Sequence, residues 1–81
     1  MLTSEASRAA RGLLGWSQSE LARKAGVGFM TVSQFENGRA AYKSTLAKLA
    51  ATFEAHGVEL IADPEKTGAV LLYARQRSAS P

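Results

Sequence analysis

Residues 17–37 read SQSELARKAGVGFMTVSQFEN, and the placing of small and apolar residues in this segment predicts how the chain folds. These residues recur three and four positions apart, so each half of the segment presents one apolar face, as two packed helices would. Gly26 separates the halves, where a tight turn between helices requires a left-handed residue that glycine adopts at almost no cost. The pattern predicts two short helices crossing at a steep angle, a helix-turn-helix. It rests on Gln18, Leu21, Ala22, Ala25, Gly26, Val27, Val32, Phe35 and Glu36.

A first helix is predicted before this segment. Thr3 or Ser4 can cap its start with a side-chain oxygen, Glu5 suits its first turn, and Gly15 ends it. Trp16 follows and is expected to be a core side chain between the first and second helices. The apolar stripe of this first helix is modest and consists of Ala6, Ala10, Leu13 and Leu14.

The second and third helices differ in how they start. Ser17 and Glu20 have the spacing of a capping box, in which each side chain satisfies a free backbone amide of the other residue. The third helix is predicted over residues 29–37, and Gly28 is an acceptable cap for it.

A fourth helix is predicted after a loop over residues 38–43. Ser44 is expected to cap it and Gly57 to close it. His56 in the last turn suits the negative end of the helix dipole. The buried face of this helix is expected to consist of Leu46, Leu49, Ala50 and Phe53.

The pattern changes after the fourth helix. Residues 58–74 read VELIA, DPEKTG and AVLLYA, which predicts two short strands around a turn that Asp63 and Pro64 start and Gly68 ends. The alternative is a fifth helix over residues 68–76, because a short apolar run cannot be assigned by its period alone. The expected organisation is a helical domain over residues 1–57, a hairpin over residues 58–74 and a flexible polar tail over residues 75–81.

The second of these strands is apolar on both faces. One face can be buried on the helices, but the other face and the open edge would be left to water, which favours association. We therefore hypothesise that residues 58–74 form a homodimer by pairing strands across a two-fold axis. The alternative is that the first and fourth helices cover both faces within one chain. The residues expected at the dimer interface are Leu60, Val70, Leu71, Leu72 and Tyr73.

The segment from about Arg8 to Leu49 resembles the helix-turn-helix of the Xre/Cro-like family, the small lambda-repressor-like regulators of bacteria and phages. The one departure is Gly28, where the family often has a serine cap. The resemblance implies a mainly α fold, a four-helix lambda-repressor-like domain that binds double-stranded DNA, followed here by the short C-terminal β-hairpin. The residues that match the family pattern are Arg11, Trp16, Ser17, Gln18, Leu21, Ala22, Gly26, Val27, Val32, Glu36 and Gly38.

Sequence discrimination would come from the outward side chains of the third helix, because a helix fits the major groove and meets base edges there. Gln34 can pair with adenine through two hydrogen bonds, and Phe29 or Met30 could touch a thymine methyl unless they pack on the second helix. The outward set contains no arginine and therefore favours A·T contacts. The residues expected to read bases are Phe29, Met30, Ser33 and Gln34.

Phosphate contacts are expected from the start of the second helix and from the loop after the third. Such contacts position a protein on DNA without selecting a sequence. The candidates are Gln18, Thr31, Asn37, Arg39 and Lys43. The family resemblance further implies a structural ion pair between Arg11 and Glu36, and Arg8 is expected to be exposed and available to phosphate.

Composition narrows the possible functions. Residues 1–50 contain seven Lys and Arg against three Asp and Glu, whereas residues 51–81 contain three against four, so the basic excess coincides with the helix-turn-helix. The chain has no cysteine and one histidine, and we expect no metal, no cofactor and no enzymatic activity. No run approaches the roughly 20 apolar residues of a membrane span. We expect a cytoplasmic protein of bacterial or phage origin that is associated with the nucleoid when bound.

The leading hypothesis is a sequence-specific DNA-binding transcription regulator. It would be a repressor that binds a pseudo-palindromic operator as a homodimer, with half-sites about one helical turn, roughly 34 Å, apart. The competing hypothesis is an antitoxin or adaptor that holds a partner protein, such as a toxin or another regulator, through its C-terminal segment and autoregulates its operon. The apolar run over residues 69–74 fits both hypotheses.

Overall fold

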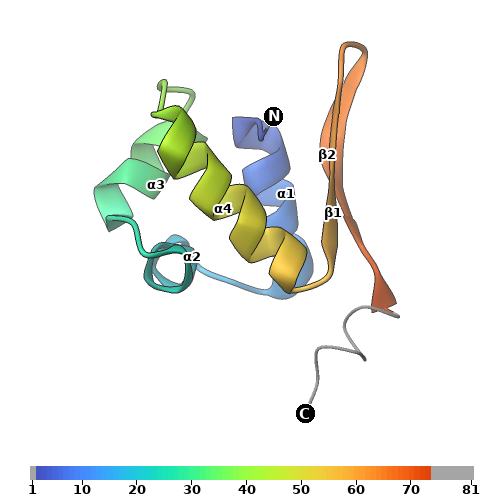
Figure 1. The fold of residues 1–81 in the computed structure, drawn as a ribbon, viewed down its shortest axis with the longest axis horizontal. Helices are drawn as coiled ribbons and strands as arrows, with labels where there is room; N and C mark the ends of the chain where they lie inside the picture. The colour runs from blue at the N-terminus through green and yellow to red at the C-terminus, as the bar shows by residue number, and fades with distance from the viewer. Residues whose placement is uncertain (1, 74–81) are drawn as a thin grey trace.

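The structure of the protein is a computed structural model that describes residues 2–73. Four helices are followed by a two-stranded antiparallel hairpin (Figure 1), which confirms the predicted mainly α fold with a C-terminal hairpin. The alternative of a helix from residue 68 is wrong, because that part of the chain is a strand; residues 74–81, including the predicted tail, lie outside the described part. The elements are α1 Ser4–Leu14, α2 Gln18–Ala25, α3 Phe29–Glu36, α4 Lys43–Ala55, β1 Val58–Asp63 and β2 Lys66–Leu71.

The starts of α1 and α2 are capped by side chains. Thr3 Oγ1 accepts a hydrogen bond from the Ala6 N–H at 3.1 Å. Ser17 and Glu20 form the predicted capping box, with Ser17 Oγ accepting from the Glu20 N–H at 3.0 Å and Glu20 Oε1 accepting from the Ser17 N–H at 2.9 Å. Gly26 ends α2 with φ of 72°, so the turn contains the expected left-handed residue.

The prediction that Ser44 caps α4 is wrong. The helix begins at Lys43, and Tyr42 occupies the capping position without a side-chain hydrogen bond. The helix starts early because the Tyr42 carbonyl already accepts the first helical hydrogen bond, from the Leu46 N–H at 3.0 Å. α3 likewise ends at Glu36, one residue before the predicted end, with Asn37 as its C-cap.

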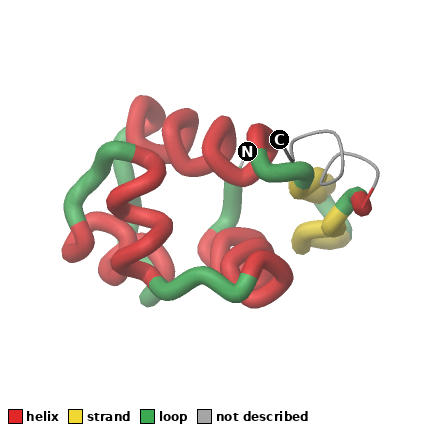
Figure 2. Tube along the Cα trace, turned by 90° about the horizontal axis from the view of Figure 1, so that it is seen from below, coloured by secondary structure: helices red, strands yellow, loops and turns green. Residues whose placement is uncertain are grey.

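One apolar core joins the helices to the hairpin. α2 packs against α3 and α4, and α1 packs against α3 and the hairpin (Figure 2). Trp16 stacks on Phe53 with 6.1 Å between ring centroids. Leu13 is 44% exposed, contrary to its predicted place in the apolar stripe of α1, whereas the polar Ser7 is buried on this helix together with Ala6 and Ala10. The buried apolar residues are Leu2, Ala6, Ala10, Leu21, Ala22, Val32, Phe35, Leu49, Phe53 and Val58.

The hairpin turn is tighter than predicted. β1 and β2 pair from Val58 with Leu71 to Asp63 with Lys66, so only two residues connect the strands. Asp63 Oδ1 accepts a hydrogen bond from the Glu65 N–H at 2.9 Å, and this closes the turn within its own residues. Gly68 therefore does not end the turn but lies inside β2.

The hairpin buries one face on α1 and α4 and exposes the other. Two of the residues expected at a dimer interface, Leu60 and Leu71, pack against the chain's own core, because the register places them on the inner face with Val58. Val70 and Tyr73 are 40% and 71% exposed. The alternative that helices cover both faces is therefore wrong for this hairpin.

α3 and the hairpin lie at opposite ends of the longest axis of the molecule, which spans 34 Å (Figure 1 and Figure 2). α3 packs on α1 and α2, whereas the strands pack on α1 and α4. The exposed face of α3 and the exposed face of the hairpin consequently point away from each other.

Candidate nucleic-acid interface

The outward stripe of α3 consists of Met30, Ser33, Gln34 and Asn37, which recur three and four residues apart. The opposite face of the helix is buried through Val32, Phe35 and Glu36. Met30 and Gln34 are exposed and Ser33 is half-buried. The helix thus presents a narrow stripe of uncharged side chains to solvent.

Phe29 and Thr31 flank the outward stripe on either side. Phe29 is 48% exposed, and Thr31 is half-buried. Met30 is 61% exposed, so much of both side chains is accessible to solvent.

Glu36 anchors the buried face of α3 to the other helices. Its side chain is 1% exposed and forms an ion pair with Arg11, whose Nη2 donates to Oε1 at 2.7 Å. Arg11 Nε lies 3.0 Å from both carboxylate oxygens, and Arg11 Nη1 donates to the Trp16 carbonyl at 3.1 Å. One guanidinium therefore links α1, α3 and the segment before α2.

Two further donors complete the shell of this carboxylate. Ser7 Oγ donates to Glu36 Oε2 at 2.6 Å, and Gln18 Nε2 donates to Oε1 at 3.1 Å. Ser7 was missed by the sequence analysis, although it lies one helical turn before Arg11 and hence on the same face of α1. One N–H of the Gln18 amide thus points inward to Glu36, while its second N–H takes no part in this interaction.

Arg8 also contacts α3. Its Nη1 donates to the backbone carbonyl of Glu36, at the end of the helix. Arg8, which is expected to be available to phosphate, thus donates one hydrogen bond to a carbonyl at the C-terminal end of α3. Its positive charge is favourable there, at the negative end of the helix dipole.

The loop after α3 is held tightly to the helix end. The Arg39 N–H donates to the Gln34 carbonyl at 3.0 Å, and the Gly38 N–H donates to the Phe35 carbonyl at 3.0 Å. Gly38 has φ of 96°, a conformation that favours glycine. Asn37, at the end of the outward stripe, and Arg39, two residues later, are both exposed.

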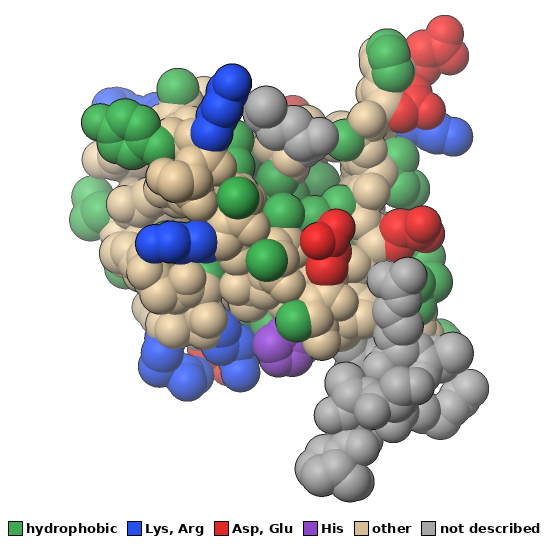
Figure 3. All heavy atoms as spheres, in the orientation of Figure 1, with side chains coloured by type: hydrophobic (Ala, Val, Ile, Leu, Met, Phe, Trp, Pro, Cys, Tyr) green, Lys and Arg blue, Asp and Glu red, His purple; other side chains and the backbone are tan. Residues whose placement is uncertain are grey.

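Charge is divided between the two ends of the molecule. Lys and Arg side chains cover the helical part, and acidic side chains are concentrated toward the hairpin (Figure 3). At the hairpin tip Lys66 Nζ lies 4.0 Å from Asp63 Oδ2. The positive side of this charge distribution coincides with the helix-turn-helix.

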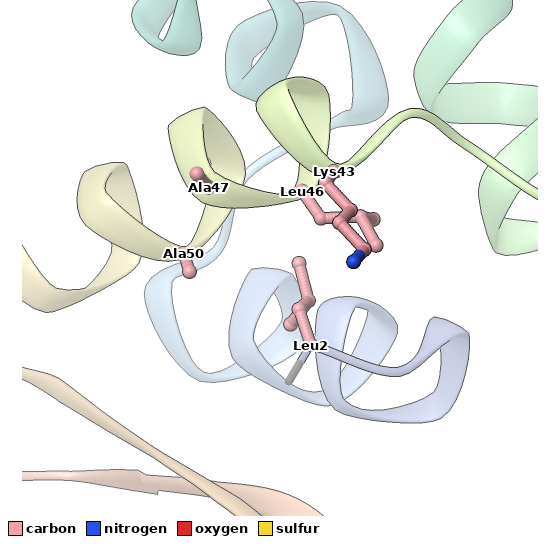
Figure 4. Close-up of a pocket in the computed structure, with 5 residues that line it drawn as sticks. All are labelled: Leu2, Lys43, Leu46, Ala47 and Ala50. Carbon is pink, nitrogen blue, oxygen red and sulfur yellow. The ribbon is translucent and has the colours of Figure 1, made fainter.

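Two hollows border α4. One of about 400 Å³ lies beside Gln34 and is lined by Thr31, Gln34, Ala40, Ala41, Tyr42 and Thr45. The other, of about 280 Å³, is apolar and runs between α4 and Leu2 (Figure 4). Lys43, at the start of α4, lines this second hollow together with Leu46.

A helix-turn-helix family model matches residues 8–60, more than half of the chain. The chain belongs to the Xre/Cro-like helix-turn-helix family. This family consists of DNA-binding regulatory domains rather than enzymes, and the protein is a DNA-binding transcription regulator of the Xre type. No curated protein matches the chain.

The carboxyl of Glu36 remains ionised in this Xre-type regulator. Burial raises the pKa of Glu36, but hydrogen bonds from Arg11, Ser7 and Gln18 and the charge of Arg11 outweigh it, so the pKa lies below its ordinary value of 4.5. The pKa of Glu20 is also lowered, mainly by its hydrogen bond from the Ser17 backbone.

We expect the regulator to lose stability in acid partly through Glu36. Because the folded-state pKa is below the unfolded one, this contribution is complete above about pH 4.5 and disappears as the pH falls through the folded-state pKa. Urea unfolding of the wild type and of Glu36→Gln between pH 7 and pH 3 measures how much of the pH dependence of the unfolding free energy comes from Glu36. The variant should show a shallower loss of stability with falling pH, and equal slopes would contradict the expectation.

Residues 2–73 of the regulator contain neither a metal-binding cluster nor a membrane-spanning helix. No group of three His, Cys, Asp or Glu side chains there is placed to hold a metal ion. None of the described helices is long and apolar enough to cross a membrane.

Proposed function

We propose that this regulator is a repressor that inserts α3 into the major groove of its operator. The observation that carries the proposal is the outward stripe of α3, which is exposed while Glu36 and its donors fix the opposite face of the helix. Such an arrangement presents side chains to base edges without reorganising the protein. The residues proposed to read bases are Phe29, Met30, Ser33 and Gln34.

Phosphate contacts are proposed on both sides of the outward stripe. Arg39 is the main candidate, because its backbone is anchored to α3 and its side chain is exposed. Thr31, Asn37 and Lys43 are further candidates. Gln18 is also proposed, through its backbone N–H at the start of α2 and through the amide N–H that is not bonded to Glu36.

Replacing Arg39 by alanine should weaken binding to all DNA sequences alike. Loss of one phosphate contact lowers the slope of log affinity against log salt by roughly one unit. Fluorescence anisotropy at several salt concentrations, on an operator and on unrelated DNA, measures both effects. A change of base preference without a change of slope would show that Arg39 reads bases instead.

Selection of bound sequences from a random duplex pool tests the proposed function most directly. We expect enrichment of a pseudo-palindrome bound by two chains. Placing the selected sequence across a promoter should lower transcription when the protein is present. Failure to enrich any motif would overturn the proposal of sequence-specific reading, and increased transcription would overturn the repressor role.

The proposed dimer joins two chains through the edge of β2. In a dimer bound to DNA, both α3 helices must face the same duplex. The exposed face of the hairpin points away from α3 (Figure 1). Packing two copies through that face would therefore point their α3 helices in opposite directions. Pairing through a strand edge avoids this. Pairing through β1 would bring Glu59 and Asp63 of the two copies together, and these like charges would repel. β2 and the residue after it contain the apolar run 69–72, which has no such charge.

Edge pairing also gives a suitable spacing. The two strands lie beside each other across the shortest axis of the molecule, which spans 20 Å (Figure 2). Two copies would therefore lie side by side along this axis, with their α3 helices at most about twice 20 Å apart, a range that includes the roughly 34 Å between successive major grooves on one side of a duplex.

Val70→Lys tests the dimer. On a sheet continued through the β2 edge, Val70 side chains of two copies would approach each other on the outer face, so introduced lysines should repel and weaken dimerisation roughly tenfold. Light scattering over a concentration series measures the change. Ala51→Lys, at an exposed position of α4, is the control. A wild-type chain that stays monomeric with and without operator DNA would overturn this part of the proposal.

A partner-binding role is the second candidate. Val70 is exposed on the outer face of the hairpin and Tyr73 is exposed just beyond β2. The hairpin and α3 lie at opposite ends of the molecule (Figure 1), so a protein bound at this end would leave α3 free. An antitoxin or adaptor would use this face to hold its partner while it regulates its own operon. Co-purification from the native host tests this, and a partner that Val70→Lys fails to release would argue against the hairpin as its site.

A further inference from the structure

Met30 occupies the most exposed apolar position on α3. It lies in the first turn of α3, midway across the width of the outward stripe, and is 61% exposed. Phe29 is less exposed, at 48%, and lies at the margin of the stripe. In helix-turn-helix proteins the N-terminal residues of the reading helix come nearest to base edges. A large apolar side chain therefore stands where the helix would meet the floor of the groove.

No ionised side chain accompanies Met30 on the outward stripe. α3 contains no Lys, Arg or Asp, and its single Glu is buried against Arg11. The helix consequently lacks the side chains that most often read guanine. The apolar group that an unmodified major groove displays is the 5-methyl of thymine, and 5-methylcytosine displays the same group beside a different hydrogen-bonding pattern.

We infer that Met30 reads the 5-methyl group of a pyrimidine, which in the natural operator is a thymine. This inference rests on the proposed major-groove function of α3. Gln34 lies four residues later on the same stripe and can bond adenine through N6 and N7, so the two side chains together select A·T pairs. The unbranched thioether of methionine adapts readily to the shape of a methyl-lined groove.

The experiment removes the methyl from the DNA and leaves its hydrogen-bonding groups in place. Each thymine of the selected operator is replaced in turn by deoxyuridine, and affinities are measured by fluorescence anisotropy at one salt concentration. We expect one position in each half-site to lose about fourfold in affinity, the value of one buried methyl. At that position 5-methylcytosine opposite guanine should bind about fourfold more tightly than cytosine opposite guanine.

Protein variants test whether Met30 is the side chain that makes binding sensitive to the thymine methyl. Met30→Ala should bind thymine and deoxyuridine equally at the sensitive position, whereas Met30→Leu should preserve the difference. Phe29→Ala removes the other exposed apolar side chain of α3 and, whatever its effect on overall affinity, should also preserve the difference. Because Met30 is exposed and outside the core, the two Met30 variants should unfold at the wild-type temperature.

The outcomes separate this inference from the proposed function. Sequence-specific binding with equal affinity for thymine and deoxyuridine at every position would overturn the inference and leave the major-groove function standing. Sensitivity that persists in Met30→Ala, or disappears in Phe29→Ala, would overturn the assignment to Met30. Loss of all sequence preference in the wild type would overturn the proposed function itself.

Discussion

Replacing Glu36 by alanine is expected to lower the free energy of unfolding by about 3–5 kcal/mol. The substitution removes the buried acceptor of Arg11, Ser7 and Gln18 and leaves these donors without it. An uncompensated buried charge is among the most destabilising single changes in a small domain. Urea unfolding followed by circular dichroism at pH 7 measures the loss.

Glu54→Ala is the control for this experiment, because Glu54 is an exposed carboxylate on α4 and its loss should change stability by less than about 0.5 kcal/mol. A double variant, Arg11→Met with Glu36→Leu, replaces the ion pair by apolar side chains and should recover much of the stability. If Glu36→Ala unfolds like the wild type, the carboxylate does not anchor α3 as the geometry indicates.

Replacing Gln34 by alanine is expected to weaken operator binding about 10- to 100-fold without a change in stability. A bidentate contact between an amide side chain and adenine contributes roughly 1–3 kcal/mol of discrimination, and the exposed Gln34 side chain makes no contribution to the core. Anisotropy titration of wild type and variant on the selected operator measures this loss.

Unrelated DNA of the same length is the internal control for Gln34→Ala. Affinity for it should stay within about twofold of the wild type, because non-specific binding depends on phosphate contacts. An equal loss on both DNAs would place Gln34 among the phosphate contacts. Unchanged operator affinity would show that the outward stripe does not read the bases at this position.

Two predictions that depended on neighbouring residues, both in α2, were accurate. The capping box of Ser17 and Glu20 and the left-handed Gly26 each involve one or two helical turns, where spacing along the chain determines which groups can meet. Turn and cap positions near the hairpin and α4 were less accurate. The Asp63 carboxylate closes the turn before Gly68, and α4 begins at Lys43 before the expected cap at Ser44.

The surroundings of Glu36 could be anticipated only in part. The family resemblance implied Arg11, but Ser7, Arg8 and Gln18 come from 29, 28 and 18 residues away and meet Glu36 only because α1 and α2 pack on α3. Their polar side chains are equally compatible with solvent when the sequence is considered alone. Arg8 and Gln18, both expected at DNA phosphates, each also donate one hydrogen bond to Glu36, which their spacing along the chain does not predict.

The order and type of the elements and the outward face of α3 follow from residue spacing, since a helix or a hairpin repeats its side-chain directions over a few residues. Three other features required the folded chain: the donors that surround Glu36, the burial of Leu60 and Leu71, and the position of the hairpin at the end opposite α3. These features depend on how distant elements pack around one core, and local periodicity contains no information about that packing.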